Sequence, residues 1–375
     1  MVQSAERIKL LFFIENLVGG GAEKVLCNLV NAMDQSRFDI TVQTLWHTDA
    51  DGILKPGIRY RSCYAGQTRL NRDRSRLEAA AGLTYPLHIR DVYDIEVAYL
   101  EFGSTKILSR STNKHAKKIA WVHSDLAQKL EGNPETLEKA RKQYDAYDRI
   151  VCVSQTARDS FVRLFGRAGD TDVLYNTIDD GAVREKAGLP PSVPSQRRRL
   201  TLAAVGRLSE EKQYDMLLRI HKRLLEAGLK QDLWIVGEGP QRAELERYIT
   251  EQKLTDSVTL FGYQANPYPY MREADLLVCS SRYEGFSTFV AEGLILGKPI
   301  VTTECSGMRE LLGDSKYGLI TDNSEAALSE GLQRLLTDAS LRETFARQAA
   351  ARGADFSASV LTQKTEAYFY HILEG

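Results

Sequence analysis

The sequence predicts an α/β protein built from two doubly wound, Rossmann-like domains. Apolar runs typical of buried strands alternate with amphipathic stretches typical of helices in the first half, and the alternation restarts in the second half. Between the halves, residues 188–199 hold three prolines within five positions and then an arginine triplet, which continues neither a helix nor a strand. Two such units joined by a linker are expected to face a cleft, with ligands at the carboxyl ends of the strands.

Each half contains five predicted strands. Strands are expected at residues 8–14, 38–45, 95–100, 119–122 and 150–153, then at 200–205, 233–236, 258–261, 276–279 and 300–303. Helices are expected between them, at 22–33, 75–83, 134–147 and 155–165, then at 213–227, 240–253, 287–296 and 325–336. These elements give an N-terminal domain (1–180), a linker (181–199), a C-terminal domain (200–356) and a final helical segment (357–375).

Composition excludes several classes of protein. A hydrophobic fraction of 43% and a charged fraction of 26% are those of a globular protein, and a net charge of −1 gives no overall field that would favour nucleic acid. The five cysteines are widely spaced without a CxxC, which favours a reducing compartment and argues against a zinc site. No apolar run reaches the length of a membrane span, so we expect a cytoplasmic protein.

Two basic runs stand out in the first half. Residues 55–76 contain seven basic side chains, and residues 106–118 contain six basic or histidine side chains with no acid between them. Either these residues form an ordinary solvated face, or they form a surface that contacts anionic lipid or a phosphate-bearing acceptor at the inner face of the membrane.

Two glutamates, Glu284 and Glu292, are separated by seven residues where a buried strand leads through a loop into a helix. Such a junction presents free N–H groups and the positive end of a helix dipole, which suits a phosphate. If most of the segment is helical, the glutamates lie roughly 12 Å apart along the axis. The paired carboxylates of glycosidases lie only about 5–9.5 Å apart. The spacing therefore favours two glutamates that each bind a different part of one elongated ligand. An exposed loop glutamate and an unrelated glutamate on the surface of the helix would give the same sequence pattern.

Further polar or glycine-rich turns follow other predicted strands. Three glycines, Gly19, Gly20 and Gly21, follow the first strand and would let a substrate approach the backbone, or would serve a tight turn. Cations at Arg207 and Lys212 suit a diphosphate leaving group, or pair with nearby acids. Other strand-end candidates are Gly206, Gly237, Gly239 and Tyr263.

His123 lies at the end of a predicted strand, where a catalytic role and a structural one are both open. Residues 49–51 (Asp-Ala-Asp) formally match a metal-binding DxD triplet. They lie in a polar loop with no strand running into it, so we expect no metal there.

Together these pieces resemble the family-4 retaining glycosyltransferases of the GT-B fold. The resemblance covers nearly the whole chain, and its motifs occur in order. They are the Gly-Gly-Ala-Glu turn at 20–23, His123, Asn-Thr-Ile-Asp at 176–179, Gly-Arg-Leu at 206–208 with Lys212, Gly-Glu-Gly-Pro at 237–240, Phe-Gly at 261–262 and the glutamate pair. Residues 266–270 (Asn-Pro-Tyr-Pro-Tyr) and 281–286 (Ser-Arg-Tyr-Glu-Gly-Phe) resemble bacterial members that build surface polysaccharides and glycoconjugates.

The resemblance implies roles for individual residues. Arg207 and Lys212 would bind the donor diphosphate, Glu284 the donor sugar and Glu292 the ribose, while the backbone near Tyr263 would hold the base. The loop residues beside Glu284 would complete the donor site: Gly285, Phe286, Ser287 and Thr288. His123 and the loop of Gly19, Gly20 and Gly21 would face the acceptor. Ser287 departs from the proline that many relatives carry, so the donor sugar is not inferred from it.

The implied reaction transfers a sugar, with retention and without a metal or other cofactor, from a nucleotide sugar that is UDP-linked by family frequency. The acceptor would be a glycan, a lipid-linked molecule or a polymer. A front-side displacement is expected, and the final helix would cross back onto the first domain. Two alternatives remain at this point, namely a non-hydrolysing nucleotide-sugar epimerase and a catalytically silent nucleotide-sugar-binding partner.

Overall fold

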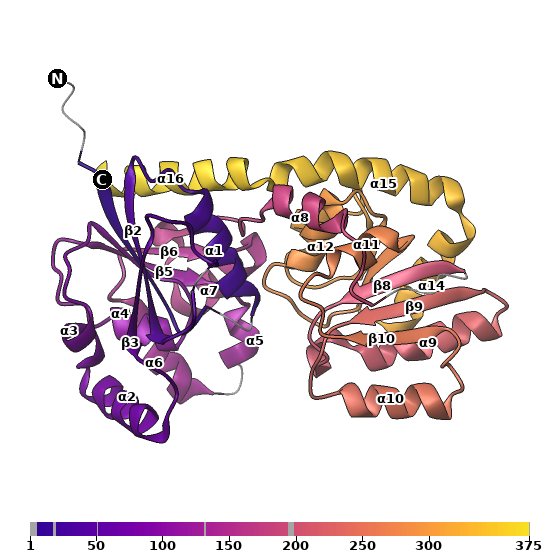
Figure 1. Cartoon of the computed structure of the whole chain (residues 1–375), viewed down its shortest axis with the longest axis horizontal. Helices are drawn as coiled ribbons and strands as arrows, with labels where there is room; N and C mark the ends of the chain where they lie inside the picture. The colour runs from indigo at the N-terminus through magenta and orange to yellow at the C-terminus, as the bar shows by residue number, and fades with distance from the viewer. Residues whose placement is uncertain (1–5, 18–19, 51, 131–132, 194–198, 375) are drawn as a thin grey trace. The chain divides into compact units, whose positions relative to one another are not determined.

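The structure, a computed structural model, describes all residues except 1–5, 18–19, 51, 131–132, 194–198 and 375. The chain divides into two compact units (Figure 1). Unit 1 comprises residues 1–177 and 358–375, and unit 2 comprises residues 178–357. Each unit is a parallel sheet flanked by helices, which confirms the predicted α/β class.

Unit 1 is built on a seven-stranded parallel sheet with the order β3-β2-β1-β4-β5-β6-β7. Its strands are β1 (Ile8–Ile14), β2 (Phe38–Trp46), β3 (Arg59–Tyr64), β4 (Ile95–Ala98), β5 (Lys117–Val122), β6 (Arg149–Cys152) and β7 (Thr171–Val173). Its helices are α1 (Gly21–Ala32), α2 (Arg69–Ala81), α3 (Thr84–His88), α4 (Gly103–Leu108), α5 (Leu126–Leu130), α6 (Pro134–Tyr144), α7 (Gln155–Phe165) and α16 (Ala358–Glu374), with a 3₁₀ turn η1 (Ala168–Asp170).

Unit 2 is built on a six-stranded parallel sheet with the order β10-β9-β8-β11-β12-β13. Its strands are β8 (Leu200–Val205), β9 (Gln231–Val236), β10 (Val258–Gly262), β11 (Leu276–Cys279), β12 (Ile300–Thr303) and β13 (Leu319–Thr321). Its helices are α8 (Asp180–Ala187), α9 (Tyr214–Glu226), α10 (Arg242–Glu251), α11 (Tyr268–Glu273), α12 (Thr288–Ile295), α13 (Met308–Leu312), α14 (Glu325–Thr337) and α15 (Ala339–Gly353). Two 3₁₀ turns, η2 (Glu210–Lys212) and η3 (Ala354–Phe356), complete it.

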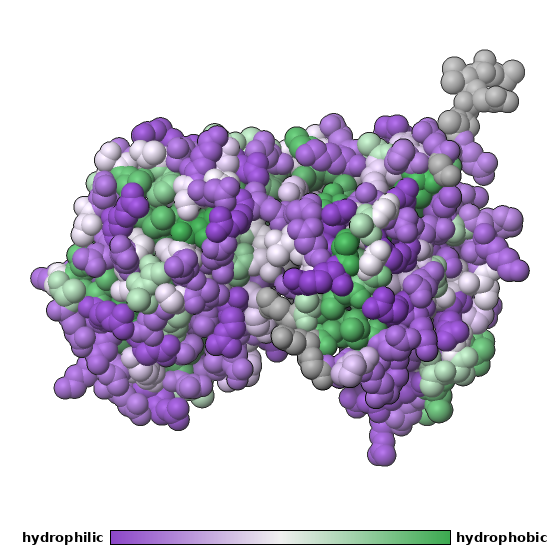
Figure 2. Space-filling view, turned by 180° about the vertical axis from the view of Figure 1, so that it is seen from behind, coloured by the Kyte–Doolittle hydropathy of each residue, from purple (hydrophilic) through white to green (hydrophobic). Residues whose placement is uncertain are grey.

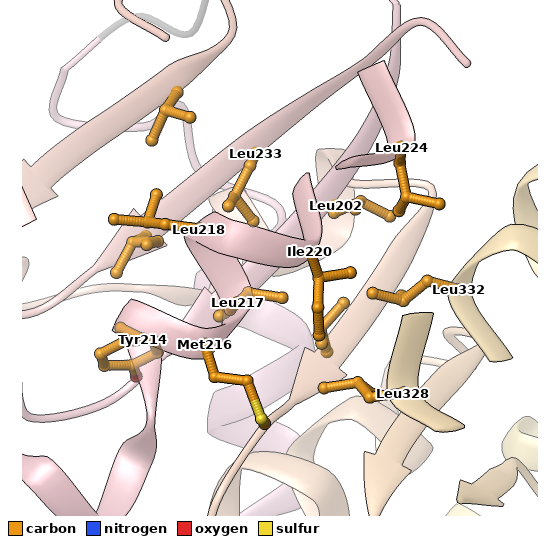
Figure 3. Packing of buried hydrophobic residues seen from close by; sticks show 14 of the residues in the cluster. Leu202, Tyr214, Met216, Leu217, Leu218, Ile220, Leu224, Leu233, Leu328 and Leu332 are labelled. Atoms are coloured by element: carbon orange, nitrogen blue, oxygen red, sulfur yellow. The ribbon is translucent and has the colours of Figure 1, made fainter. Parts of the chain in front are cut away.

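Helix α9 shows how the apolar pattern builds the core of unit 2. Its apolar side chains recur on one face and are buried, including Leu217 and Ile220. They pack in one cluster with Leu202 of β8, Leu233 of β9 and Leu328 of α14 (Figure 3). Each fully buried leucine contributes roughly 1.5–3 kcal/mol, so this face fixes α9 against the sheet.

The structure contains elements that the sequence pattern did not reveal. Strands β3, β7 and β13 lie at sheet edges, where short strands with polar side chains lack an apolar run. Helix α15 has few buried residues and therefore little apolar periodicity. Helix α8 occupies part of the range predicted as a linker (181–199), and residues 194–198 of that range lie outside the described residues.

Helix α16, drawn in yellow at the end of the chain, belongs to unit 1 and lies beside α1 (Figure 1). Phe369 is fully buried and packs against the rings of Phe12 and Phe38, on β1 and β2. The Glu366 carboxylate accepts a hydrogen bond from the backbone N–H of Asp34 at 2.8 Å. The end of the chain is therefore part of the core of unit 1.

Candidate functional site

Two glycine turns meet backbone to backbone at the carboxyl ends of β8 and β9. The N–H of Gly206 donates to the carbonyl of Val236, and the N–H of Leu208 donates to the carbonyl of Glu238 at 2.9 Å. A Cβ on Gly237 would lie 1.9 Å from the carbonyl oxygen of Gly206, and one on Gly239 would lie 2.3 Å from that of Leu208. Gly237 also has a φ of +150°, so only glycine fits this contact without strain. The close approach fixes the turn that carries Arg207.

The cations of this turn differ in environment. Arg207 is exposed, and no ion pair of its guanidinium occurs among the residues that the structure describes. Lys212, at the end of η2, is partly buried, with a side chain 22% exposed. Its backbone carbonyl accepts a hydrogen bond from the Ser280 hydroxyl, which ties η2 to the end of β11.

Lys212 and Glu284 form the central ion pair of unit 2. The Lys212 Nζ lies 2.6 Å from Glu284 Oε1, and the Ser281 hydroxyl donates to the same oxygen at 2.7 Å. Burial favours the neutral amine, but the adjacent carboxylate outweighs this and raises the pKa of Lys212. Strands β8 and β11 are neighbours in the sheet, which is why residues 72 positions apart meet here.

Glu292 lies deeper than Glu284. It is buried in α12, and the Tyr268 hydroxyl of α11 donates to its Oε1 at 2.9 Å. Helix α12 begins only at Thr288, after Ser287, whose side chain accepts a hydrogen bond from the N–H of Val290. Residues 288–292 of the segment from 284 to 292 are therefore helical, whereas its first four residues form a loop, so the rise of an α-helix applies to only part of the separation between the two glutamates.

The other predicted donor-side residues surround this centre in different ways. Phe286 is buried and packs against Phe356, whereas Tyr263, directly after β10, is 74% exposed. Gly285 and Thr288 are partly buried within the loop and the first turn of α12.

In unit 1, the glycine turn after β1 is only partly described. Gly20 is the N-cap of α1 and Gly21 begins the helix, whereas Gly19 lies outside the described residues. A Cβ on Gly21 would meet no atom within 4 Å, so the turn is open on that side.

His123 follows β5 and carries an unsatisfied ring nitrogen. Its Nε2 is buried and has no hydrogen-bond partner among the described residues, while its ring packs on Tyr99 with centroids 4.8 Å apart. Burial lowers the pKa of His123 to about 4, although nearby Glu101 acts in the opposite direction. The imidazole is therefore neutral near pH 7, and its Nε2 can form one hydrogen bond with a ligand hydroxyl.

Glu101 supports the loop that carries His123 and was missed in the sequence. The backbone N–H of His123, the hydroxyl of Ser124 and the ammonium of Lys129 all donate to its buried carboxylate. Burial opposes the charge, but Lys129 and the other donors outweigh it and lower the pKa of Glu101. The next residue, Phe102, has a φ of +66°, an uncommon conformation outside glycine. A polar residue directly after the predicted strand at 95–100 was the available signal, the same signal that singled out His123.

Family models match both halves of the chain. One, described as Glycosyltransferase Family 4, matches residues 19–181, and a second, described as Glycosyl transferases group 1, matches residues 189–352. The chain belongs to the family-4 glycosyltransferases of the GT-B fold. Neither the sugar epimerase nor the silent binding partner is favoured by these matches.

Three bacterial proteins illustrate what this glycosyltransferase is similar to. A Campylobacter jejuni protein named N-acetylgalactosamine-N,N'-diacetylbacillosaminyl-diphospho-undecaprenol 4-alpha-N-acetylgalactosaminyltransferase is 34% identical over 49% of this chain and 49% of its own length. The lipopolysaccharide core biosynthesis glycosyltransferase LpsE of Rhizobium meliloti is 24% identical over 88% of this chain and 89% of its own. The Anabaena protein HepE, solved in complex with UDP-glucose, shares the fold with a TM-score of 0.76 at 19% identity, covering 97% of this chain and 100% of that one.

The rest of this glycosyltransferase offers neither a metal cluster nor a membrane span within its described part. No group of three or more His, Cys, Asp or Glu side chains placed to hold a metal occurs there, and Asp51 of the DxD triplet lies outside it. Among the same residues, no helix is long and apolar enough to cross a bilayer. On the face drawn in Figure 2, hydrophobic residues (green) lie in separate areas among hydrophilic ones (purple).

Proposed function

We propose that the protein transfers a sugar, with retention of configuration and without a metal, from a UDP-sugar to a hydroxyl of a glycan, glycolipid or polymer acceptor in bacterial surface-glycan synthesis. The observation that carries the proposal is the Lys212–Glu284 pair at the carboxyl edge of the sheet in unit 2, with Arg207 in the same segment after β8. This edge is where ligands of parallel α/β sheets bind.

The two cations suit a diphosphate leaving group. Lys212 is held in its charged form by Glu284, and Arg207 is exposed with no ion pair among the described residues. A fixed cation that meets developing negative charge is among the largest contributions to catalysis. Arg207 and Lys212 would therefore take the place of a metal ion at the diphosphate.

The surroundings of the two glutamates favour a front-side displacement. Glu284 accepts hydrogen bonds from Lys212 and Ser281, and Glu292 accepts one from Tyr268. A carboxylate held in this way is a poor nucleophile but a good acceptor for sugar or ribose hydroxyls. In the proposed reaction, the new glycosidic bond forms on the face from which the diphosphate leaves, and a departing phosphate oxygen accepts the proton of the acceptor hydroxyl.

Similar proteins support the classes of donor and acceptor. HepE binds UDP and UDP-glucose in its crystal structures, and the Campylobacter jejuni and Rhizobium meliloti proteins are named for a diphospho-undecaprenol-linked acceptor and for lipopolysaccharide core biosynthesis. His123 and the turn of Gly20 and Gly21 are proposed to face the acceptor. The imidazole of His123 is neutral, and its Nε2, which has no hydrogen-bond partner among the residues that the structure describes, suits a hydroxyl group.

We also propose peripheral contact with the anionic inner face of the membrane through residues 55–76 and 106–118. The structure divides the first run, because Arg59 and Arg61 of β3 pair with Asp39 and Asp91. Helix α2 instead exposes Leu70 and Leu77, at 77% and 72%, among several arginines. Exposed leucines beside arginines are typical of a helix that lies on a membrane surface.

Two measurements test the proposed function. A thermal-shift panel of UDP, GDP, ADP and their sugar conjugates, with a chelator present, should give a selective response to one nucleotide that is lost in Arg207→Ala. With that donor, the anomeric coupling constants of the product should match those of the donor. An inverted product, or a response only after a divalent metal is added, would refute retention or metal independence respectively.

A further inference from the structure

A pocket lies in unit 1, apart from His123. It has a volume of about 390 Å³ and lies beside the carboxyl ends of β1 and β2, between α2 and the start of α4. This volume falls within the range of small-molecule sites. The residues assigned above to the acceptor side, Gly20, Gly21 and His123, are not part of its lining.

The lining combines cations with an apolar base. Arg72, Arg76 and Lys106 contribute three cations, against the single carboxylate of Glu15. All three cations are solvent-exposed, whereas the Trp46 and Ile107 side chains are buried. The cations therefore surround the mouth and the apolar side chains form the deeper wall.

The cations are available to a ligand. No ion pair of Arg72 or Lys106 occurs among the described residues, and Arg76 has only a distant one with Asp73, at 3.9 Å. By contrast, Arg74 on the same helix points away to Glu78, at 2.6 Å, and does not line the pocket. Three cations brought together from two separate elements, α2 and α4, repel one another unless an anion is bound.

We propose that this pocket binds the diphosphate group of an acceptor whose other end carries an apolar chain. The cations would hold the phosphate oxygens, and Glu15 would accept a hydroxyl of the adjoining sugar. The apolar chain would leave the mouth and pass over α2 to its opposite, solvent-exposed face, where Leu70 and Leu77 lie. The assignment rests on the proposed function, since it names the acceptor class for the same reaction.

The sheet order is consistent with a diphosphate bound in the pocket and a reacting hydroxyl bound near His123. Strand β4 alone separates β1, whose end carries Glu15, from β5, whose end carries His123. Neighbouring strands lie about 4.8 Å apart, so the ends of β1 and β5, and with them Glu15 at the near side of the pocket and His123, are separated by roughly 10 Å along one edge. That distance leaves room for the acceptor's sugar between its diphosphate and its reacting hydroxyl.

The test measures binding of farnesyl diphosphate, inorganic pyrophosphate and farnesol to the full chain by calorimetry. Saturating UDP is present throughout, so that the diphosphate site proposed in unit 2 is filled. Farnesyl diphosphate should bind more tightly than pyrophosphate, and farnesol should not bind. Arg72→Gln and Lys106→Gln should each weaken the binding by about tenfold, the value of one charged hydrogen bond.

Arg69→Gln is the matched control, because Arg69 is an exposed arginine of the same helix outside the lining. It should leave the affinity unchanged. No binding of either diphosphate, or an equal loss in Arg69→Gln, would overturn the pocket. Equal affinities for farnesyl diphosphate and pyrophosphate would overturn the apolar chain. The response to UDP alone reports on the proposed function separately, and it should be the same in all three variants.

Discussion

At the scale of single residues, the decisive contact is the one between Lys212 and Glu284. Substituting Lys212 by methionine keeps the apolar stem and removes the cation that meets the leaving diphosphate. Turnover should fall by about 10²–10³, the cost of losing one group that stabilises developing charge. Steady-state kinetics with a saturating donor would measure this, and unchanged turnover would remove Lys212 from the site.

Stability has to be separated from catalysis in that variant. Lys212→Met leaves the Glu284 carboxylate, only 12% exposed, with fewer partners, at a cost of roughly 1–3 kcal/mol. The double variant Lys212→Met/Glu284→Gln should recover most of this stability, because no unpaired charge remains, but none of the turnover. Recovery of turnover together with stability would show that the pair is only structural.

Glu101 gives a second prediction at this scale. Glu101→Gln keeps the shape of the side chain but loses the charge that draws Lys129 and the His123 loop together. Turnover should fall by about tenfold or more, because small misplacements of a positioned group are costly. The KM for the donor, which is proposed to bind unit 2, should change little.

A matched control for Glu101 is Glu96→Gln, which alters another buried carboxylate of unit 1. Tyr85 donates to Glu96 at 2.5 Å, and Glu96 contacts neither His123 nor its loop in any described hydrogen bond. This variant should change the melting temperature without a selective loss of turnover. An equal loss of turnover in both variants would reduce Glu101 to a general stabilising role.

The sequence identified only those candidate residues that follow a predicted strand. Arg207, His123 and Glu284 each follow a strand, and parallel topology brings such positions to one edge within each unit. Which of them touch could not be predicted, because the Lys212–Glu284 contact depends on β8 lying next to β11. The burial of Glu101 was invisible for the same reason, since its partners lie on a different strand-end loop.

At the scale of elements, helix α2 changes how the basic residues of 55–76 are interpreted. The sequence predicted a helix only over 75–83, but α2 begins at Arg69, after the N-cap Thr68. The arginines of residues 55–76 are therefore divided between an edge strand, where they pair with acids, and a helix that exposes some of them. Periodicity missed this start because α2 has little apolar surface to bury, and its few buried positions are Ser75 and Glu78.

Glu78 anchors α2 and predicts a pH dependence. Burial opposes its charge, but hydrogen bonds from Tyr64, Arg74 and His88 outweigh this and lower its pKa to about 2. Because an unfolded glutamate titrates near about 4.3, the stabilisation is complete above that pH and is lost as the pH falls toward 2. Its size should be roughly 1–3 kcal/mol.

The measurement compares unfolding free energies of the parent protein and Glu78→Gln between pH 6 and about 2.5, a range that spans most of this titration. The difference between the two proteins should shrink as the pH falls, since protonation removes the charge that the variant lacks. A difference that is constant with pH would mean that the carboxylate is not charged in the folded state.

Membrane contact also belongs to α2. Leu70→Ser/Leu77→Ser should weaken co-sedimentation with anionic phospholipid vesicles by about tenfold or more, because leucine side chains that enter the lipid contribute most of such binding. Both side chains are exposed, so the melting temperature should not change. Leu189→Ser, at an exposed leucine of unit 2, is the control and should bind vesicles normally. Undiminished binding of the α2 variant would exclude this face.

At the scale of the whole molecule, the chain folds as two units, and unit 2 is inserted between the two segments that form unit 1. The chain leaves unit 1 after Thr177 and returns at Ala358, so that α16 completes a core begun by β1 and β2. The sequence predicted two α/β domains and a last helix, because the periodic spacing of apolar residues within each element can be recognised without knowing which elements touch. The aromatic contacts of Phe369 could not be predicted, since they join residues more than 300 positions apart.

This organisation predicts two separable unfolding transitions. Phe369→Ala removes a fully buried ring from unit 1, at a cost of about 3–5 kcal/mol, and should lower one calorimetric transition. The proposed UDP site lies in unit 2, so UDP should raise the midpoint temperature of the other transition. At 100 times its dissociation constant, UDP adds about 2.7 kcal/mol to the unfolding free energy of that unit. The UDP response should be the same in the parent and in Phe369→Ala. If the variant also lost that response, or if both transitions moved together in every case, the two units would be one cooperative body and α16 would couple donor binding to the stability of unit 1.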